Sequence, residues 1–268
     1  MNRSVFVILL ALGSLGILIS FVRARSRAVF EQDGFAAPGR RAAAVVLLAL
    51  VLLLTVIIPF AGGLAGGPPD PSRLSLVSVF AVHGMLLAFL ACYFALSGHR
   101  RPSDFLKLSS PRPLQDISAG VPIGIFGWVV TLLGAAVVAV FWLALRGKIS
   151  AADPSATGIP PTIVWILAQP VWVRIAIVVS AMTVEELFFR AFLQTRVGPL
   201  ASTLMFTAAH GVYGQPLLLV GILVISTVLS VTFLRYKNVL PCIAAHGTFD
   251  AIQMFVVIPG VAKLIGGG

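Results

Sequence analysis

Three charged side chains stand close together inside an apolar stretch of the chain: Glu185, Glu186 and Arg190. A charged side chain at the centre of a bilayer costs roughly 2.5–3.5 kcal/mol on insertion scales, so three of them in one hydrophobic helix indicate a functional site. Glu186 and Arg190 are four residues apart with the acid first, the order that favours an ion pair along a helix. Glu185 projects about 100° away from Glu186, which leaves its carboxylate free for another partner.

Two later apolar stretches also carry polar side chains. Phe206 and His210 are four residues apart, and so are His246 and Asp250, so each pair shares one helix face. At about 1.5 Å of rise per residue, Glu185 lies roughly 16 Å from either end of its stretch, His210 roughly 18 Å from Gly198, and His246 and Asp250 roughly 13 and 20 Å from Lys237. We therefore expect them to converge on a cavity. The expected cluster consists of Glu185, His210, His246 and Asp250, held in place by the pair of Glu186 and Arg190.

This set of groups suits hydrolysis. A desolvated Glu185 would take a proton from water as general base, and His210 would orient or deprotonate the same water. His246 and Asp250 would stabilise the oxyanion that forms on the scissile carbonyl. A zinc site is the second interpretation, with His210, His246 and Asp250 as candidate ligands and the remaining glutamate as base. The chain has no His-Glu-x-x-His motif, and both a divalent metal such as zinc and a metal-free mechanism stay open.

The composition indicates that these groups lie in a membrane. The 268 residues are 59% hydrophobic and 10% charged, whereas soluble domains carry about 25% charged residues. The net charge of +10 comes from short clusters between apolar runs, which is typical of membrane proteins and argues against nucleic-acid binding. We predict an all-α polytopic transmembrane bundle in a single integral-membrane domain, residues 1–268, with catalytic helices at 174–258. The expected spans are 4–22, 42–64, 74–96, 117–145, 174–194, 199–213, 216–234 and 240–258.

The distribution of basic residues predicts the orientation of about eight spans. The loops after the first, third, fifth and seventh spans hold twelve of the nineteen Lys and Arg residues. Positive residues favour the cytoplasmic side, so these loops are expected there and both termini outside. The apolar stretch 162–172 is short and carries two tryptophans, which favours an interfacial lead-in over a full span.

Several other residues within the apolar stretches have structural roles in this interpretation. Gly120 and Gly124 are spaced for close packing between two helices. Cys92 and Cys242 are expected as buried free thiols. His83 is expected to be a hydrogen-bond partner between helices rather than a proton relay.

The polar motifs resemble those of the CAAX prenyl protease and bacteriocin-processing (CPBP, or Abi) family of intramembrane endopeptidases. The resemblance covers about residues 183–253 and rests on three motifs that occur in order on separate apolar stretches. They are Glu185-Glu186-x-x-x-Arg190, Phe206-x-x-x-His210 and His246-x-x-x-Asp250.

The resemblance implies a bundle of about eight helices in the cell membrane, with a site in its cytoplasmic half. It implies endoproteolysis of membrane-associated proteins or peptides, lipidated chains among them, by water that Glu185 and His210 activate. His246 and the last motif residue would act at the oxyanion. The family has been described both as glutamic proteases and as metalloproteases.

Asp250 departs from the prenyl-processing members, which carry asparagine at the last motif position. An ionised aspartate cannot donate a hydrogen bond to an oxyanion. Asp250 is therefore expected to be protonated, to orient His246 or to bind a metal. A second function class is a proton- or ion-coupled transporter that uses the same carboxylates and histidines, although such transporters more often show paired repeats, and none is visible here.

Overall fold

The computed structural model describes residues 33–66, 70, 74–146 and 161–260, and every regular element in this part of the chain is helical. Five of these helices are long and apolar enough to cross a membrane. They are Pro38–Leu64, Leu76–Leu96, Pro113–Val138, Leu218–Tyr236 and Leu240–Gly260. The predicted all-α polytopic bundle is confirmed, while the expected span at 4–22 lies outside the described residues.

Proline begins six of the α-helices, where its missing N–H would have no partner within the helix in any case. Three segments, η1, η3 and η5, are π-helical, and η4 is a 3₁₀ turn. In chain order the elements are α2 (Pro38–Leu52), η1 (Leu53–Ile57), α3 (Ile58–Gly66), α4 (Leu76–Leu96), α5 (Pro102–Phe105), α6 (Pro113–Arg146), α8 (Pro161–Leu167), α9 (Val171–Glu186), η3 (Leu187–Gln194), α10 (Thr195–Val197), α11 (Pro199–Ala209), η4 (His210–Tyr213), α12 (Pro216–Tyr236), α13 (Leu240–Ile252) and η5 (Gln253–Val257).

The helix that carries the two glutamates is longer than α9 alone. The junction residues Leu187 and Thr195 keep right-handed helical backbone, so α9, η3 and α10 form one continuous helix. It ends at Gly198, whose φ of +88° is readily available only to glycine. The expected stretch 174–194 lies within this helix.

The expected sixth span, 199–213, differs from the structure. Its α-helix, α11, has 11 residues and is roughly 16 Å long, too short to cross a hydrocarbon core of about 30 Å. The α-helix gives way to the 3₁₀ turn η4, and the chain then reverses at Gly214, where φ is +64°. Pro216 starts α12 directly afterwards.

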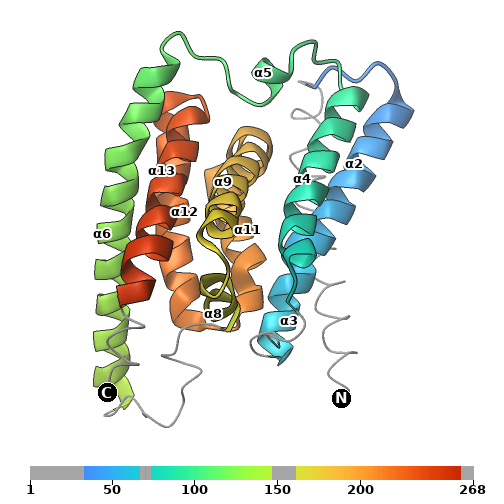
Figure 1. The fold of residues 1–268 in the computed structure, drawn as a ribbon. Helices are drawn as coiled ribbons and strands as arrows, with labels where there is room; N and C mark the ends of the chain where they lie inside the picture. Colours follow the sequence, from blue (N-terminus) through green and yellow to red (C-terminus); the bar gives the residue numbers. More distant parts are fainter. Residues whose placement is uncertain (1–32, 67–69, 71–73, 147–160, 261–268) are drawn as a thin grey trace.

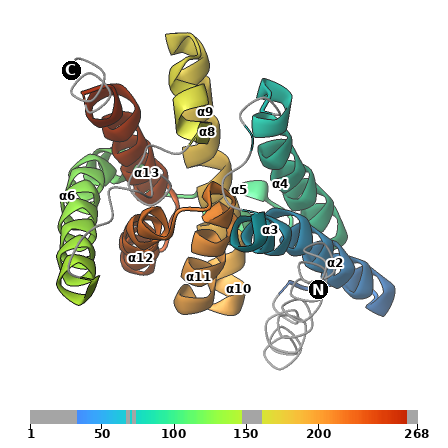
Figure 2. The same ribbon diagram turned by 90° about the horizontal axis from the view of Figure 1, so that it is seen from below.

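The helices form two groups on either side of α9 and α11. Figure 1 shows α6, α12 and α13 on one side and α2 and α4 on the other, and Figure 2 shows the same division from below. Contacts agree with this arrangement, since α13 packs on α6 and α9, and α4 packs on α2 and α9. The helix with the two glutamates is therefore central, with neighbours on both sides.

Two glycines bring α6 and α13 close together. A Cβ atom at Gly120 would lie 2.5 Å from the carbonyl oxygen of Pro241, and one at Gly124 would lie 2.7 Å from Cβ of Thr248. Both distances are too short for a real side chain, so the close packing predicted from the glycine spacing is confirmed. This contact fixes α13, the helix that carries the last motif.

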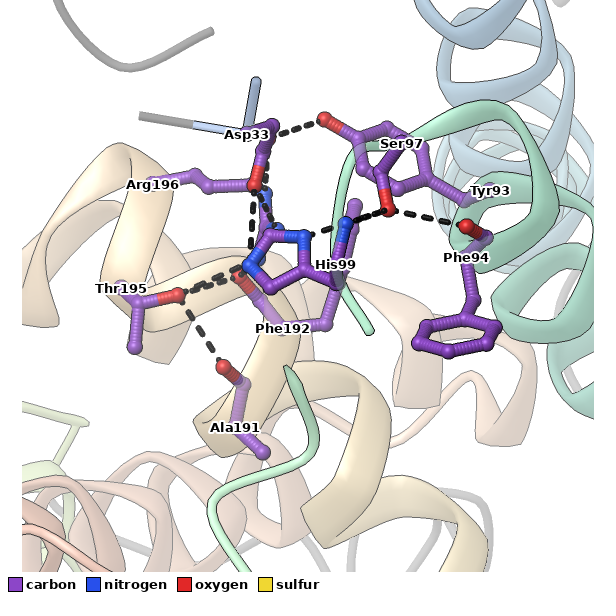
Figure 3. A network of polar contacts seen from close by, with 9 residues as sticks. All are labelled: Asp33, Tyr93, Phe94, Ser97, His99, Ala191, Phe192, Thr195 and Arg196. Carbon is purple, nitrogen blue, oxygen red and sulfur yellow. Dashed lines mark hydrogen bonds and ion pairs between the residues drawn. The ribbon is translucent and has the colours of Figure 1, made fainter. Parts of the chain in front are cut away.

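A polar network closes the bundle at the end near α5 (Figures 1 and 3). Arg196 donates from Nη2 to Asp33 Oδ1 at 2.6 Å and from Nε to Asp33 Oδ2 at 3.1 Å, a bidentate pair. The Tyr93 hydroxyl donates to the same carboxylate at 2.5 Å, and the guanidinium lies 4.0 Å from the Phe192 ring centroid. The network ties the central helix to α4 and to the chain before α2.

The two cysteines are free, but only one of them is buried. Cys242 is fully buried in α13, whereas Cys92 is exposed on the outer face of α4. The prediction that both are buried is therefore wrong for Cys92. The outer face of a membrane helix is as apolar as its packed face, so hydropathy does not distinguish the two sides.

Candidate active site

Glu185 and Glu186 end α9 and are followed directly by the π-helical segment η3, all of whose residues are buried. Segments of π-helix recur at functional sites because they shift side chains relative to the regular helical ladder. The two glutamates face different neighbours. Glu185 contacts α4 and η4, and Glu186 contacts α13 and the next helical turn.

Glu186 is fully buried, and both of its carboxylate oxygens are bonded. Arg190 Nε donates to Glu186 Oε2 at 3.2 Å, the ion pair that the spacing predicts. His246 Nδ1 lies 3.0 Å from Glu186 Oε1. Arg190 is fully buried as well, and it donates from Nη2 to Ser226 Oγ on α12 at 3.0 Å. The pair of Glu186 and Arg190 thus joins the central helix to α12 and α13.

Glu185 has more open surroundings, with a side chain that is 14% exposed. His83 Nε2 lies 3.3 Å from its Oε1, a hydrogen-bond distance. His210 Nε2 lies 3.8 Å from its Oε2, which is too long for a direct hydrogen bond. Glu185 Oε2 has no hydrogen-bond partner among the described residues, so one carboxylate oxygen keeps its lone pairs free.

A backbone carbonyl fixes the ring of His210. Its Nδ1 lies 2.8 Å from the Phe206 oxygen, which can only accept, so Nδ1 carries the hydrogen and Nε2 of the neutral ring is an acceptor. The Phe206 ring packs 4.6 Å from the His210 ring, between centroids. Gly211 allows η4 to touch α3, since a Cβ there would lie 2.8 Å from Cα of Phe60. The turn thereby holds His210 toward Glu185.

His246 lies between two carboxyl groups. Its Nδ1 faces Glu186 as described above, and its Nε2 lies 3.4 Å from Asp250 Oδ2 on the next turn of α13. Both ring nitrogens therefore face carboxyl oxygens; a neutral ring donates to one of them and a protonated ring to both. Gly247 permits the close approach of α9, because a Cβ at that position would overlap the sulfur of Met182.

A cavity of about 330 Å³ adjoins only part of this cluster. Glu185, His210 and His83 line it together with mainly apolar side chains of α3, α4, α8, α9 and η4. His246 and Asp250 are not among its lining residues. The structure thus brings all the predicted site residues into one chain of contacts, with Glu185 and His210 at the cavity and the others behind them.

The cluster does not fit a metal ion in this arrangement. In the part of the chain that the structure describes, no three His, Cys, Asp or Glu side chains are placed to hold one. His246 directs both ring nitrogens at carboxyl oxygens, and His210 directs its available nitrogen at Glu185. The candidate ligands His210, His246 and Asp250 are therefore not arranged as a set.

Two residues of the cluster, His83 and Ser180, are not among the expected site residues. His83 is a hydrogen-bond partner between helices, as expected, but its partner is Glu185 itself, and Ser180 Oγ lies 2.8 Å from its other ring nitrogen. A depth argument could have found His83. It precedes the end of α4 by thirteen residues, about 20 Å, and Glu185 precedes the end of α10 by twelve, about 18 Å.

Comparison with known families gives an independent test of the motif resemblance. A family model described as type II CAAX prenyl endopeptidase, Rce1-like, matches residues 167–252, which include every predicted site residue. No curated protein and no solved structure shows a significant match to the chain. The match covers less than half of the chain and, through residues 167–252, agrees with the resemblance to the CPBP endopeptidases.

Proposed function

We propose that this multi-pass membrane protein is an intramembrane endopeptidase in which Glu185 and His210 activate the attacking water. The observation that carries the proposal is the Oε2 atom of Glu185, which has no hydrogen-bond partner among the described residues, lies 3.8 Å from His210 Nε2 and belongs to a side chain that lines the cavity. A general base needs an available lone pair within reach of water. Both oxygens of Glu186 are bonded, so Glu186 is not suited to that task.

The hydrogen-bond geometry supports a water between Glu185 and His210. Glu185 Oε2 and His210 Nε2 are both acceptors and lie 3.8 Å apart, so neither can bond to the other directly. A water molecule beside them can donate one hydrogen to each. Such a water is oriented by both groups, and its oxygen lone pair is free to attack a carbonyl carbon.

The proposed reaction follows the usual course of amide hydrolysis. Glu185 takes a proton as the water oxygen bonds to the scissile carbonyl carbon, and the C–N bond then breaks as that proton passes to the leaving amine. His246 does not line the cavity and directs both ring nitrogens at carboxyl oxygens, so it would act on the charge of the carbonyl oxygen electrostatically from behind the cavity and not through a hydrogen bond. We assign Asp250 to orienting His246, since their side chains are 3.4 Å apart.

The proposed substrates are membrane-associated proteins or peptides, lipidated chains among them. The cavity supports this choice because its lining is mainly apolar and includes Val82, Leu86 and Ile177. Apolar groups are favoured in such a pocket over charged ones. The family match does not favour the transporter alternative.

The basic residues in the described loops and near the helix ends favour one orientation of the bundle. Apart from Arg146 and Arg174, they gather at the end near α5, where α4 ends and α6 begins (Figure 1), and by the positive-inside rule we propose that this end faces the cytoplasm. They are Arg40, Arg41, Arg100, Arg101, Lys107, Arg112, Arg196, Arg235 and Lys237.

The cavity extends toward the opposite end of the bundle. Its outer lining includes Ser78 near the start of α4 and Val212 after α11, both of them exposed. We therefore propose access from the non-cytoplasmic side, in contrast to the cytoplasmic half that the family resemblance implies. A membrane-impermeant maleimide applied to intact cells should label Ser78→Cys and leave Arg112→Cys unlabelled. The reverse pattern would restore the cytoplasmic assignment.

The proposed activity can be tested with protein purified in detergent and a library of quenched fluorogenic peptides. We expect cleavage at internal peptide bonds, equal before and after treatment with a chelator. Glu185→Gln, which lacks the proposed base, gives the background rate of the assay. Loss of cleavage with a stoichiometric metal, restored by its return, would contradict the metal-free mechanism but keep the peptidase activity. A wild-type protein that cleaves no peptide, in micelles or in liposomes, would contradict the function itself.

A further inference from the structure

A pair of residues outside the three family motifs, His83 and Ser180, contacts the proposed catalytic base. His83 belongs to α4, whereas Ser180 lies on α9, five residues before Glu185. The His83 ring connects the two α9 residues, with Nδ1 2.8 Å from Ser180 Oγ and Nε2 3.3 Å from Glu185 Oε1. His83 is 8% exposed, so solvent does not compete strongly for either contact.

The donors and acceptors of this pair allow one consistent arrangement for a neutral ring. An ionised Glu185 only accepts, so the hydrogen must be on His83 Nε2. His83 Nδ1 is then an acceptor, and the Ser180 hydroxyl can donate to it. Glu185 thus selects the tautomer of His83 that donates to it, and the Ser180 hydroxyl bonds to the remaining nitrogen and holds the ring in place.

We propose that His83, held by Ser180, is a positioning residue for Glu185. The terminal torsion of a glutamate is broad and nearly two-fold, so the side chain alone does not decide which oxygen faces which neighbour. The bond from His83 holds Oε1 and leaves Oε2 directed at His210. This inference rests on the proposed function, since it concerns the orientation of the base in that reaction.

The first test compares kinetics and stability of His83 variants on the same quenched peptides. His83→Leu should lower kcat about ten- to hundredfold, because misplacing a catalytic group by about 1 Å can cost about that much, with a much smaller change in KM. His83→Gln should recover a large part of the loss, since its amide can donate to Glu185 and accept from Ser180. Wild-type kcat in His83→Leu, or no recovery in a folded His83→Gln, would overturn the proposal.

Ser180→Ala tests the positioning of the His83 ring by Ser180 in a protein that keeps His83. We expect a lower kcat, which Ser180→Thr restores. Ser202→Ala is the matched control, because Ser202 Oγ also joins two helices, donating to the Phe189 carbonyl at 2.6 Å, but does not contact the cluster. The control should lower thermal stability and keep kcat. Equal loss of kcat in Ser180→Ala and Ser202→Ala would show that His83 contributes to stability and does not position Glu185.

A measurement without substrate separates this inference from the proposed function. The chain has four histidines, so the ¹⁵N signals of His83 can be assigned by comparison with His83→Leu. We expect a neutral ring protonated at Nε2 in the wild type and a mixture of tautomers in Glu185→Gln, whose amide can donate as well as accept. A ring protonated at Nδ1 would overturn the inference whatever the enzyme cleaves. Absence of all peptide cleavage, with the expected tautomer present, would instead contradict the proposed function alone.

Discussion

Glu185 and Glu186 are adjacent in the chain but differ in their surroundings. Glu186 is fully buried and has a guanidinium and an imidazole on its two oxygens. Glu185 lines a cavity, contacts two imidazoles and keeps one oxygen without a hydrogen-bond partner in the described part of the chain. The comparison indicates that one carboxylate is fixed as part of the scaffold while its neighbour remains available for chemistry.

The largest effect on activity is expected from Glu185→Gln. Glutamine keeps the size of the side chain and can still accept from His83, but it cannot take a proton from water. General base catalysis contributes about 10²- to 10⁴-fold, so kcat should fall by that factor while folded yield and melting temperature stay near those of the wild type. Peptide cleavage and thermal unfolding in detergent measure the two quantities. Retained turnover would remove Glu185 from the base role.

The largest effect on stability is expected from Arg190→Ala, which leaves Glu186 buried without its guanidinium partner. Removing one member of a buried pair typically costs about 3–5 kcal/mol, so folded yield and thermal stability should both fall. Arg174→Ala is the control, since Arg174 is only partly buried and stands near the start of α9. Normal stability of Arg190→Ala would show that Glu186 does not depend on the pair.

The geometry of a single helix is enough to predict from the sequence that Glu185 and Glu186 have different neighbours. Four-residue spacing predicts the pair of Glu186 and Arg190, and the 100° step between neighbours predicts that Glu185 points elsewhere. Both statements concern one helix, so no tertiary information is needed. The grouping of His210 and His246 with the two glutamates also follows, because depth can be counted along each helix.

Other features depend on how helices rotate about their axes and how they end. The rotation of α4 places His83 against Glu185 and turns Cys92 outward, and an all-apolar helix has no polar face from which to predict this. Similarly, α11 is short because of backbone turns around Gly214 rather than any change in hydropathy. The contact of His246 with Glu186 does not follow from the sequence either, since it depends on the distance between α9 and α13, whereas the approach of Asp250 to His246 follows from their four-residue spacing.

The contact between α6 and α13 offers a smaller test of the scaffold around Glu186. In Gly124→Ala the new methyl group would meet the backbone and Thr248 of α13, which should shift His246 away from Glu186. Overpacking of this kind costs about 1–3 kcal/mol. Gly62→Ala is the matched control, because no atom lies within 4 Å of a Cβ placed there. A stability loss in Gly124→Ala similar to that of the control would contradict the tight contact.

The smallest effect is expected from Asp250→Asn, which introduces the residue of the prenyl-processing relatives. If Asp250 acts by orienting His246, the asparagine oxygen can still accept from Nε2, and kcat should fall by less than about tenfold. Asp250→Leu removes the acceptor and should cost more, with similar stability. An unchanged kcat in Asp250→Leu would limit the working site to Glu185, His210 and His83. If Asp250→Leu lost as much kcat as Glu185→Gln, the residues around Glu186, behind the cavity, would take part in the reaction as well.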